Sequence, residues 1–137
     1  MADISVTAAN VLKASGATVY NGTAGATVTA GQPVYQDSSD GYKFKPAQAD
    51  TAAKAKAYGI ALHAASDEQP LQVITAGGLN IGATLTVGQV YVVSDAAAGG
   101  VAPYADLASG DFVTLLGVAT TASNLAVDIQ VSGIAKP

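Results

Sequence analysis

The 137-residue chain lacks cysteine, and all six of its basic residues are lysines. Without cysteine it can form neither disulfides nor thiolate zinc sites, so packing or association must stabilise it. Without arginine it lacks the bidentate group that suits phosphate and guanine, which argues against a nucleic-acid partner. No stretch approaches the ~20 consecutive apolar residues of a membrane helix, so we expect no membrane partner.

Histidine is nearly absent as well, because His63 is the one imidazole of the chain. Catalysis usually needs a base, a nucleophile or a metal held in place. The acidic residues stand mostly in predicted turns, where aspartate accepts hydrogen bonds from nearby backbone N–H groups. We therefore expect no catalytic residue, no metal site and no cofactor, and we expect that the protein is not an enzyme.

The N-terminus, MADISVTAANVLKASG, has neither a basic start nor an apolar block of signal-peptide length. A secretory signal is therefore not expected, and the sequence predicts a protein made in a cytoplasm. The net charge of −4 mainly bears on solubility.

The most informative feature present is an internal repeat. ATVTAGQPVYQDSSD begins at Ala26, and ATLTVGQVYVVSD begins at Ala83, 57 positions later. The comparison continues through YGIA and LGVA, and LQV at 71–73 then matches LAV at 125–127 at an offset of 54. The two copies cover about 26–76 and 83–133, within a single predicted β domain at 26–137.

Strand patterns fill both copies. In LAVDIQVSG, apolar residues alternate with polar or small ones, which is typical of a half-buried strand. GQVYVVSD, YGIALHA, PLQVIT and DFVTLLGVATT are rich in β-branched and aromatic residues between turn residues. The sequence predicts an all-β fold, a small barrel or sandwich of about eight to ten short strands built from two similar halves.

Two segments depart from this pattern. ADTAAKAKA at 49–57 is alanine-rich and forms a loop insertion in the first copy, where we expect a turn or two of helix with Asp50 as its cap. The alternative is an irregular crossing of the surface. Residues 1–25 lie outside the repeat and form an expected N-terminal arm, extended and able to dock on its own domain or on a neighbour. Its candidate contact residues are Ile4, Val6, Val11 and Leu12.

A second candidate contact is a cluster of lysines. Four of the six lysines fall within fourteen residues of an otherwise acidic chain, at Lys43, Lys45, Lys54 and Lys56. They indicate either a face that meets an acidic partner or an ordinary solvated strand and loop. The six tyrosines leave a similar choice between a sugar-stacking face and packing at the ends of a barrel.

Taken together, MADISVTAANVL, AGQPVYQDSSDGYKFKPAQAD, YGIALHAASDEQPLQVITAGG, TVGQVYVVSDAAAGGVAP and LGVATTASNLAVDIQVSG resemble the capsid decoration, or cement, proteins of tailed bacteriophages. The resemblance covers almost the whole chain and rests on the order of glycine turns and short strands. No single motif anchors it.

The resemblance implies a virion protein that binds the major capsid protein on the outer surface of an icosahedral head and stabilises the shell. It also implies self-association, commonly as a homotrimer. The alternative from another class is a head fibre or carbohydrate-binding module that presents tyrosines to host surface sugars.

Overall fold

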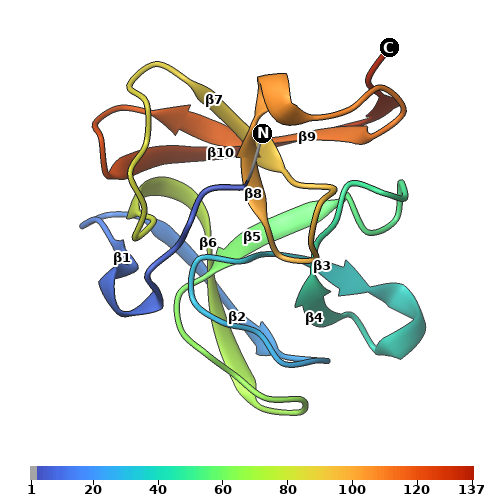
Figure 1. The fold of residues 1–137 in the computed structure, drawn as a ribbon. Helices are drawn as coiled ribbons and strands as arrows, with labels where there is room; N and C mark the ends of the chain where they lie inside the picture. Colours follow the sequence, from blue (N-terminus) through green and yellow to red (C-terminus); the bar gives the residue numbers. More distant parts are fainter. Residues whose placement is uncertain (1–2) are drawn as a thin grey trace.

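A computed structural model describes residues 3–137, which form ten strands, three short 3₁₀ turns and no α-helix. All strands join one antiparallel sheet that curls into a half-barrel, which confirms the all-β prediction (Figure 1). The strands are β1 (Leu12–Lys13), β2 (Thr18–Thr23), β3 (Pro33–Asp37), β4 (Lys43–Pro46), β5 (Ala57–Ala61), β6 (Pro70–Asn80), β7 (Val90–Val93), β8 (Val101–Pro103), β9 (Phe112–Ala119) and β10 (Asn124–Ala135).

The two halves of the sheet share one connectivity. The first repeat has the order β4-β3-β5-β6 and the second has β8-β7-β9-β10, and β6 pairs with β10 where they meet. Val34 lies opposite Pro46, and Tyr91 lies opposite Pro103, which is the same register 57 residues later. The β3·β5 and β7·β9 ladders even carry a bulge at the same place. Equivalent sequence positions thus occupy equivalent places in the two halves.

The last strand of each repeat is the exception. Val73 lies opposite Ala61 in the first repeat, whereas Leu125 lies opposite Ala119 in the second. The register therefore aligns Val73 with Leu125 at an offset of 52, and the sequence match of Leu71 with Leu125 is wrong by two residues. A slip of two keeps the same faces of a strand inward, so the apolar pattern alone cannot detect it.

Buried side chains form two groups. The larger contains residues of both repeats, among them Ile60 from β5 and Leu116 from β9. The smaller lies in the first repeat around Phe44, with Val34 and Val73 beside it, and includes Ala24 of the arm. The larger group joins the halves, so the second repeat rests against the first.

The N-terminal arm covers strand edges of the sheet. Its strand β2 pairs along β6, with Tyr20 opposite Val73. Further upstream, the Ile4 N–H donates to the Val101 carbonyl of β8 at 2.8 Å. Exposed edges invite pairing with other chains, and the arm satisfies part of that hydrogen-bonding capacity within the molecule.

The helix expected at 49–57 is absent, and the segment forms successive turns instead. One helical-type bond forms there, from the Ala55 N–H to the Thr51 carbonyl at 3.0 Å. So short a stretch cannot recover the cost of helix nucleation. The second repeat holds the segment instead, because the Phe112 N–H donates to the Ala49 carbonyl at 2.9 Å.

Candidate functional site

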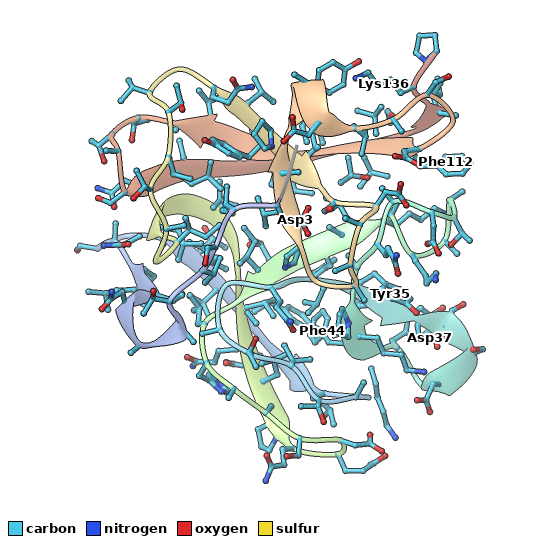
Figure 2. All side chains as sticks on the ribbon, viewed as in Figure 1. Asp3, Tyr35, Asp37, Phe44, Phe112 and Lys136 are labelled. Carbon is cyan, nitrogen blue, oxygen red and sulfur yellow. The ribbon has the colours of Figure 1, made fainter. Side chains whose placement is uncertain are left out.

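The arm is fixed to the body of the protein at its very beginning. Besides the bond between Ile4 and Val101, the Asp3 carboxylate accepts a hydrogen bond from the Ser94 hydroxyl, which is buried. Figure 2 shows Asp3 over the middle of the molecule rather than at its rim. The described part of the arm is therefore a docked segment.

The four apolar candidates of the arm have different surroundings. Ile4 and Val11 are partly buried and pack against the larger core, and Val6 is also partly buried. Leu12 differs, because 70% of it is exposed. The first three hold the arm in place, and Leu12 is the candidate that is presented to a partner.

A hollow of about 630 Å³ lies beside Leu12, between the arm and the segment that links β6 to β7. Its lining is mostly small and polar and includes Ser5, Thr7, Asn10, Asn80, Thr84 and Ser123. A leucine beside polar groups that can hydrogen-bond suits a protein partner better than a buried small molecule. We call Leu12 and this hollow the arm face.

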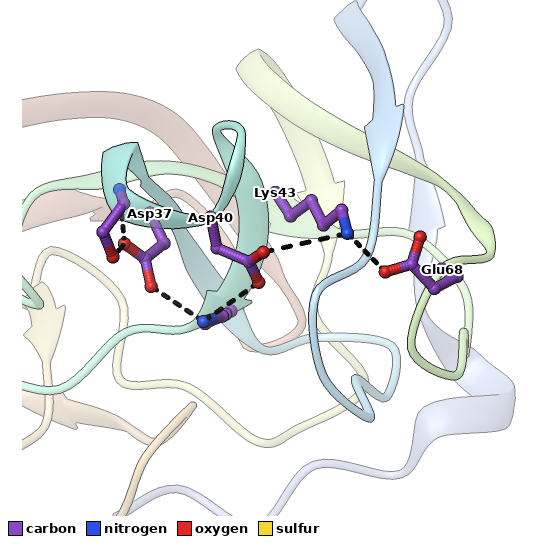
Figure 3. Close-up of polar contacts among 6 residues, drawn as sticks. Asp37, Asp40, Lys43 and Glu68 are labelled. Atoms are coloured by element: carbon purple, nitrogen blue, oxygen red, sulfur yellow. Dashed lines mark hydrogen bonds and ion pairs between the residues drawn. The ribbon is translucent and has the colours of Figure 1, made fainter.

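The lysine cluster is largely neutralised. The Lys45 Nζ lies 2.7 Å from Asp37 and 3.3 Å from Asp40, and Lys43 contacts both Asp40 and Glu68 (Figure 3). The pair between Lys43 and Glu68 ties the β3-β4 hairpin to the turn before β6, and the other pairs lie within the hairpin. Their lysines therefore brace the fold and offer little free positive charge to an acidic partner.

The remaining two candidates differ from each other. Lys54 pairs with Asp50 at 3.0 Å, four residues away. Lys56 is exposed and has no ion pair within residues 3–137. Of the four lysines, Lys56 alone carries a charge that the described chain does not compensate.

The network also shifts proton affinities. Hydrogen bonds from Lys45 and Ser39 lower the pKa of Asp37 to about 2. The same contact raises the pKa of Lys45, and hydrogen bonding to Glu68 raises the pKa of Lys43. Each shift favours the charged form, as expected for paired groups near the surface.

A second acidic group lies where the two repeats meet. A side-chain hydrogen bond with Asp111 raises the pKa of Asp95, and burial and the nearby charges of Asp111, Asp50 and Asp3 add to the shift. Within residues 3–137 no set of His, Cys, Asp or Glu is arranged to hold a metal ion.

His63 is occupied by structural hydrogen bonds. Its Nε2 accepts from the Gln72 N–H at 3.0 Å, and its Nδ1 lies 2.9 Å from the Ala64 carbonyl. These contacts assign the proton to Nδ1, because a carbonyl can only accept. The Nε2 atom thus accepts a hydrogen bond from β6 in place of a backbone carbonyl of a neighbouring strand.

The tyrosines do not gather on one face. Tyr20 and Tyr58 pack edge to face at 5.1 Å beside Phe44, and each is 40% exposed. Tyr91 is buried and its hydroxyl accepts from the Thr86 N–H at 2.9 Å. Tyr42 and Tyr104 are exposed too, at 63% and 37%, so the Tyr20–Tyr58 pair is the one place where two exposed tyrosine rings pack together within residues 3–137.

One surface escaped the sequence reasoning. The outer side of β7, β9 and β10 carries a shallow apolar groove around Val90 and Leu115. The repeat contains a signal for it, since Ala55 and Ala57 of the first copy are replaced by Val113 and Leu115 in the second. These larger apolar side chains line the groove in the second half.

The described residues contain no helix that is long and apolar enough to cross a membrane. Comparison with known protein families finds no match to this chain, and comparison with curated proteins finds no relative.

Proposed function

We propose that this protein is a structural virion protein that binds the outer surface of an icosahedral bacteriophage head and stabilises it. Its main partner is the major capsid protein, and self-association, as a homotrimer in the family it resembles, provides the second contact. It is made in the host cytoplasm and carries out no catalysis.

The observation that carries this proposal is the arm face. The arm is held by backbone bonds along its length, yet it leaves Leu12 70% exposed beside a polar hollow of about 630 Å³. A docked segment that presents an apolar side chain suits recognition of a protein surface. The all-β body and the structural use of His63 and the lysines are compatible with a binding role.

A decoration protein stabilises a shell because many linked copies bind it at the same time. Each arm face makes a modest contact, and linked subunits raise the effective concentration of the remaining contacts by orders of magnitude. A protein that binds the assembled shell and not its separated parts also stabilises the shell by mass action. Neither effect requires an active site.

The test is binding of Leu12 variants to heads that lack this protein, measured by co-sedimentation. We expect Leu12→Ser to weaken binding at least tenfold, and Tyr42→Ser to leave it unchanged. Tyr42 is a matched control because it is 63% exposed and lies on the far hairpin between β3 and β4. Equal binding by both variants would remove the arm face from the proposal.

A second candidate function is a head-fibre or carbohydrate-binding module, and it rests on the exposed Tyr20–Tyr58 pair. Quenching of tyrosine fluorescence by host polysaccharide, with loss of quenching in Tyr20→Leu, would favour it. If the polysaccharide leaves the fluorescence unchanged, decoration stands as the better proposal.

A further inference from the structure

One face of the sheet is buried in the first repeat, and the equivalent face of the second repeat is partly exposed. The surface, which we call the outer face, is buried in the first repeat and comprises Pro33, Ala47, Ala55, Ala57 and Ile60. The register makes its equivalents in the second repeat Val90, Tyr104, Val113, Leu115 and Val118. Ile60 is 0% exposed, whereas its equivalent Val118 is 41% exposed. The same structural position is thus core in one half and surface in the other.

The second repeat is what covers the first outer face. The Thr114 hydroxyl donates to the Ala55 carbonyl, and the Gly99 N–H donates to the Ala47 carbonyl at 2.7 Å. Ile60 also shares the larger core with Leu116. Within one chain, therefore, the outer face of one repeat packs on the inner side of the next.

Within residues 3–137 the second outer face is only partly covered: Val113 and Leu115 are half-buried, and the Lys136 Nζ lies 4.5 Å from the centre of the Tyr104 ring. Two adjoining hollows of about 500 and 260 Å³ lie on it and share Val90 and Leu115 in their walls. Asp128 stands at its border, exposed and without an ion pair in the described chain. An apolar surface of this kind with a charge at its border is typical of a site for a protein partner.

The first repeat carries the matching inner side. In the second repeat, the residues that meet the first outer face include Thr114 and Leu116, which are both 0% exposed. Their equivalents in the first repeat are Lys56 and Tyr58, and Tyr58 is 40% exposed. We call Lys56 and Tyr58 the docking surface. No preceding repeat covers it, and Tyr20 of the arm packs on one side of Tyr58 and leaves 40% of that residue exposed.

We propose that the second outer face binds the docking surface of a second copy of this chain, so that the packing between repeats continues from one chain to the next. Continuity with the existing repeat interface supports a second copy as the occupant. Charge is compatible with it, because Asp128 borders one surface and Lys56 lies on the other. Lys136 also borders the outer face, where it lies over the Tyr104 ring and donates to the carbonyls of Tyr104 and Leu107.

The two surfaces differ, so the contact is head-to-tail. Such a contact generates a closed ring when the rotation closes, and an open chain otherwise. This inference rests on the self-association in the proposed function and names the surfaces that would carry it. The arm face lies on another strand, so loss of association and loss of capsid binding can be measured separately.

The experiment measures the mass of the full-length protein in solution by sedimentation velocity over a wide concentration range. We expect wild type to associate reversibly. Val118→Lys on the outer face and Tyr58→Lys on the docking surface should each weaken association at least tenfold. Ala64→Lys is the matched control, because it places the same charge on an exposed residue of the turn between β5 and β6 and should associate as wild type does.

Mixing the two defective variants tests the head-to-tail geometry. Val118→Lys keeps an intact docking surface and Tyr58→Lys keeps an intact outer face, so the mixture should form a one-to-one dimer and nothing larger. Lys56→Asp replaces Tyr58→Lys if thermal unfolding shows that the loss of the tyrosine destabilises the fold. A monomeric wild type, association unaffected by Val118→Lys, or a mixture that stays monomeric would each overturn the proposal.

Discussion

The pair Ile60 and Val118 allows a sharp test of how the repeats pack. Both residues occupy the same place in the register, but Ile60 is 0% exposed in the core between the repeats and Val118 is 41% exposed. Truncating a buried isoleucine to alanine typically costs about 2–5 kcal/mol, because transfer and cavity terms add. Removal of two methyl groups from a partly exposed valine should cost about 1 kcal/mol or less.

Urea unfolding, followed at low protein concentration so that association does not contribute, measures both effects. With a slope of about 1–3 kcal/mol per molar urea, a loss of about 3 kcal/mol lowers the midpoint by about 1–3 M. We expect that shift for Ile60→Ala and a shift several times smaller for Val118→Ala. Equal shifts would refute the assignment of one face as core and its equivalent as surface.

Three further predictions concern charge and backbone. Asp95 has a raised pKa in the folded state, so its contribution to stability is present below its unfolded value and lost as pH rises through the folded one. Asp95→Asn should therefore unfold at higher urea than wild type at pH 7, and less so at pH 4; the reverse order would contradict the raised pKa of Asp95. Asp37 has the opposite sign, since its pKa is lowered to about 2, and wild type should lose stability between pH 4 and 2 in a transition that Asp37→Asn removes. Gly117→Ala should cost about 1–3 kcal/mol by denaturant unfolding, because a Cβ there would lie 2.9 Å from the Ala126 carbonyl carbon, in backbone that cannot yield easily; an unchanged midpoint would refute that close approach.

Several elements of the fold follow directly from local chemistry. Gly31 and Gly88 stand at φ +87° and +82°, a conformation that glycine adopts readily, so the repeated Gly-Gln pairs predicted their turns. Alternation in LAVDIQVSG predicted β10, and Leu125 and Val127 are indeed buried. These features depend on a few neighbouring residues, which is why the sequence alone indicates them.

Other features depend on contacts between distant segments. The alanine-rich segment at 49–57 has the composition of a helix, but the second repeat pairs with its backbone and buries Ala55. The lysine cluster reads as a positive face, yet Glu68, 25 residues beyond Lys43, neutralises part of it. Tertiary context overrides local preference in both cases.

In the candidate contact surfaces, too, some features follow from the local sequence and others depend on contacts between distant segments. Sequence identified the arm, but not that Ile4 and Val11 pack inward while Leu12 points outward. It showed the repeat, but not that one copy would bury the outer face and the other expose it. Burial of that kind is decided by which repeat lies on which, and the apolar pattern is compatible with either order.

Counting copies bound per capsid tests the central claim most directly. Purified protein is titrated onto phage heads that lack it, and the sedimented heads are analysed for bound protein at saturation. Decoration predicts saturable binding in a simple ratio to the major capsid subunit, together with heads that resist heat or chelator better than bare ones. Binding that does not saturate, or no binding at mild salt, would contradict the proposed function.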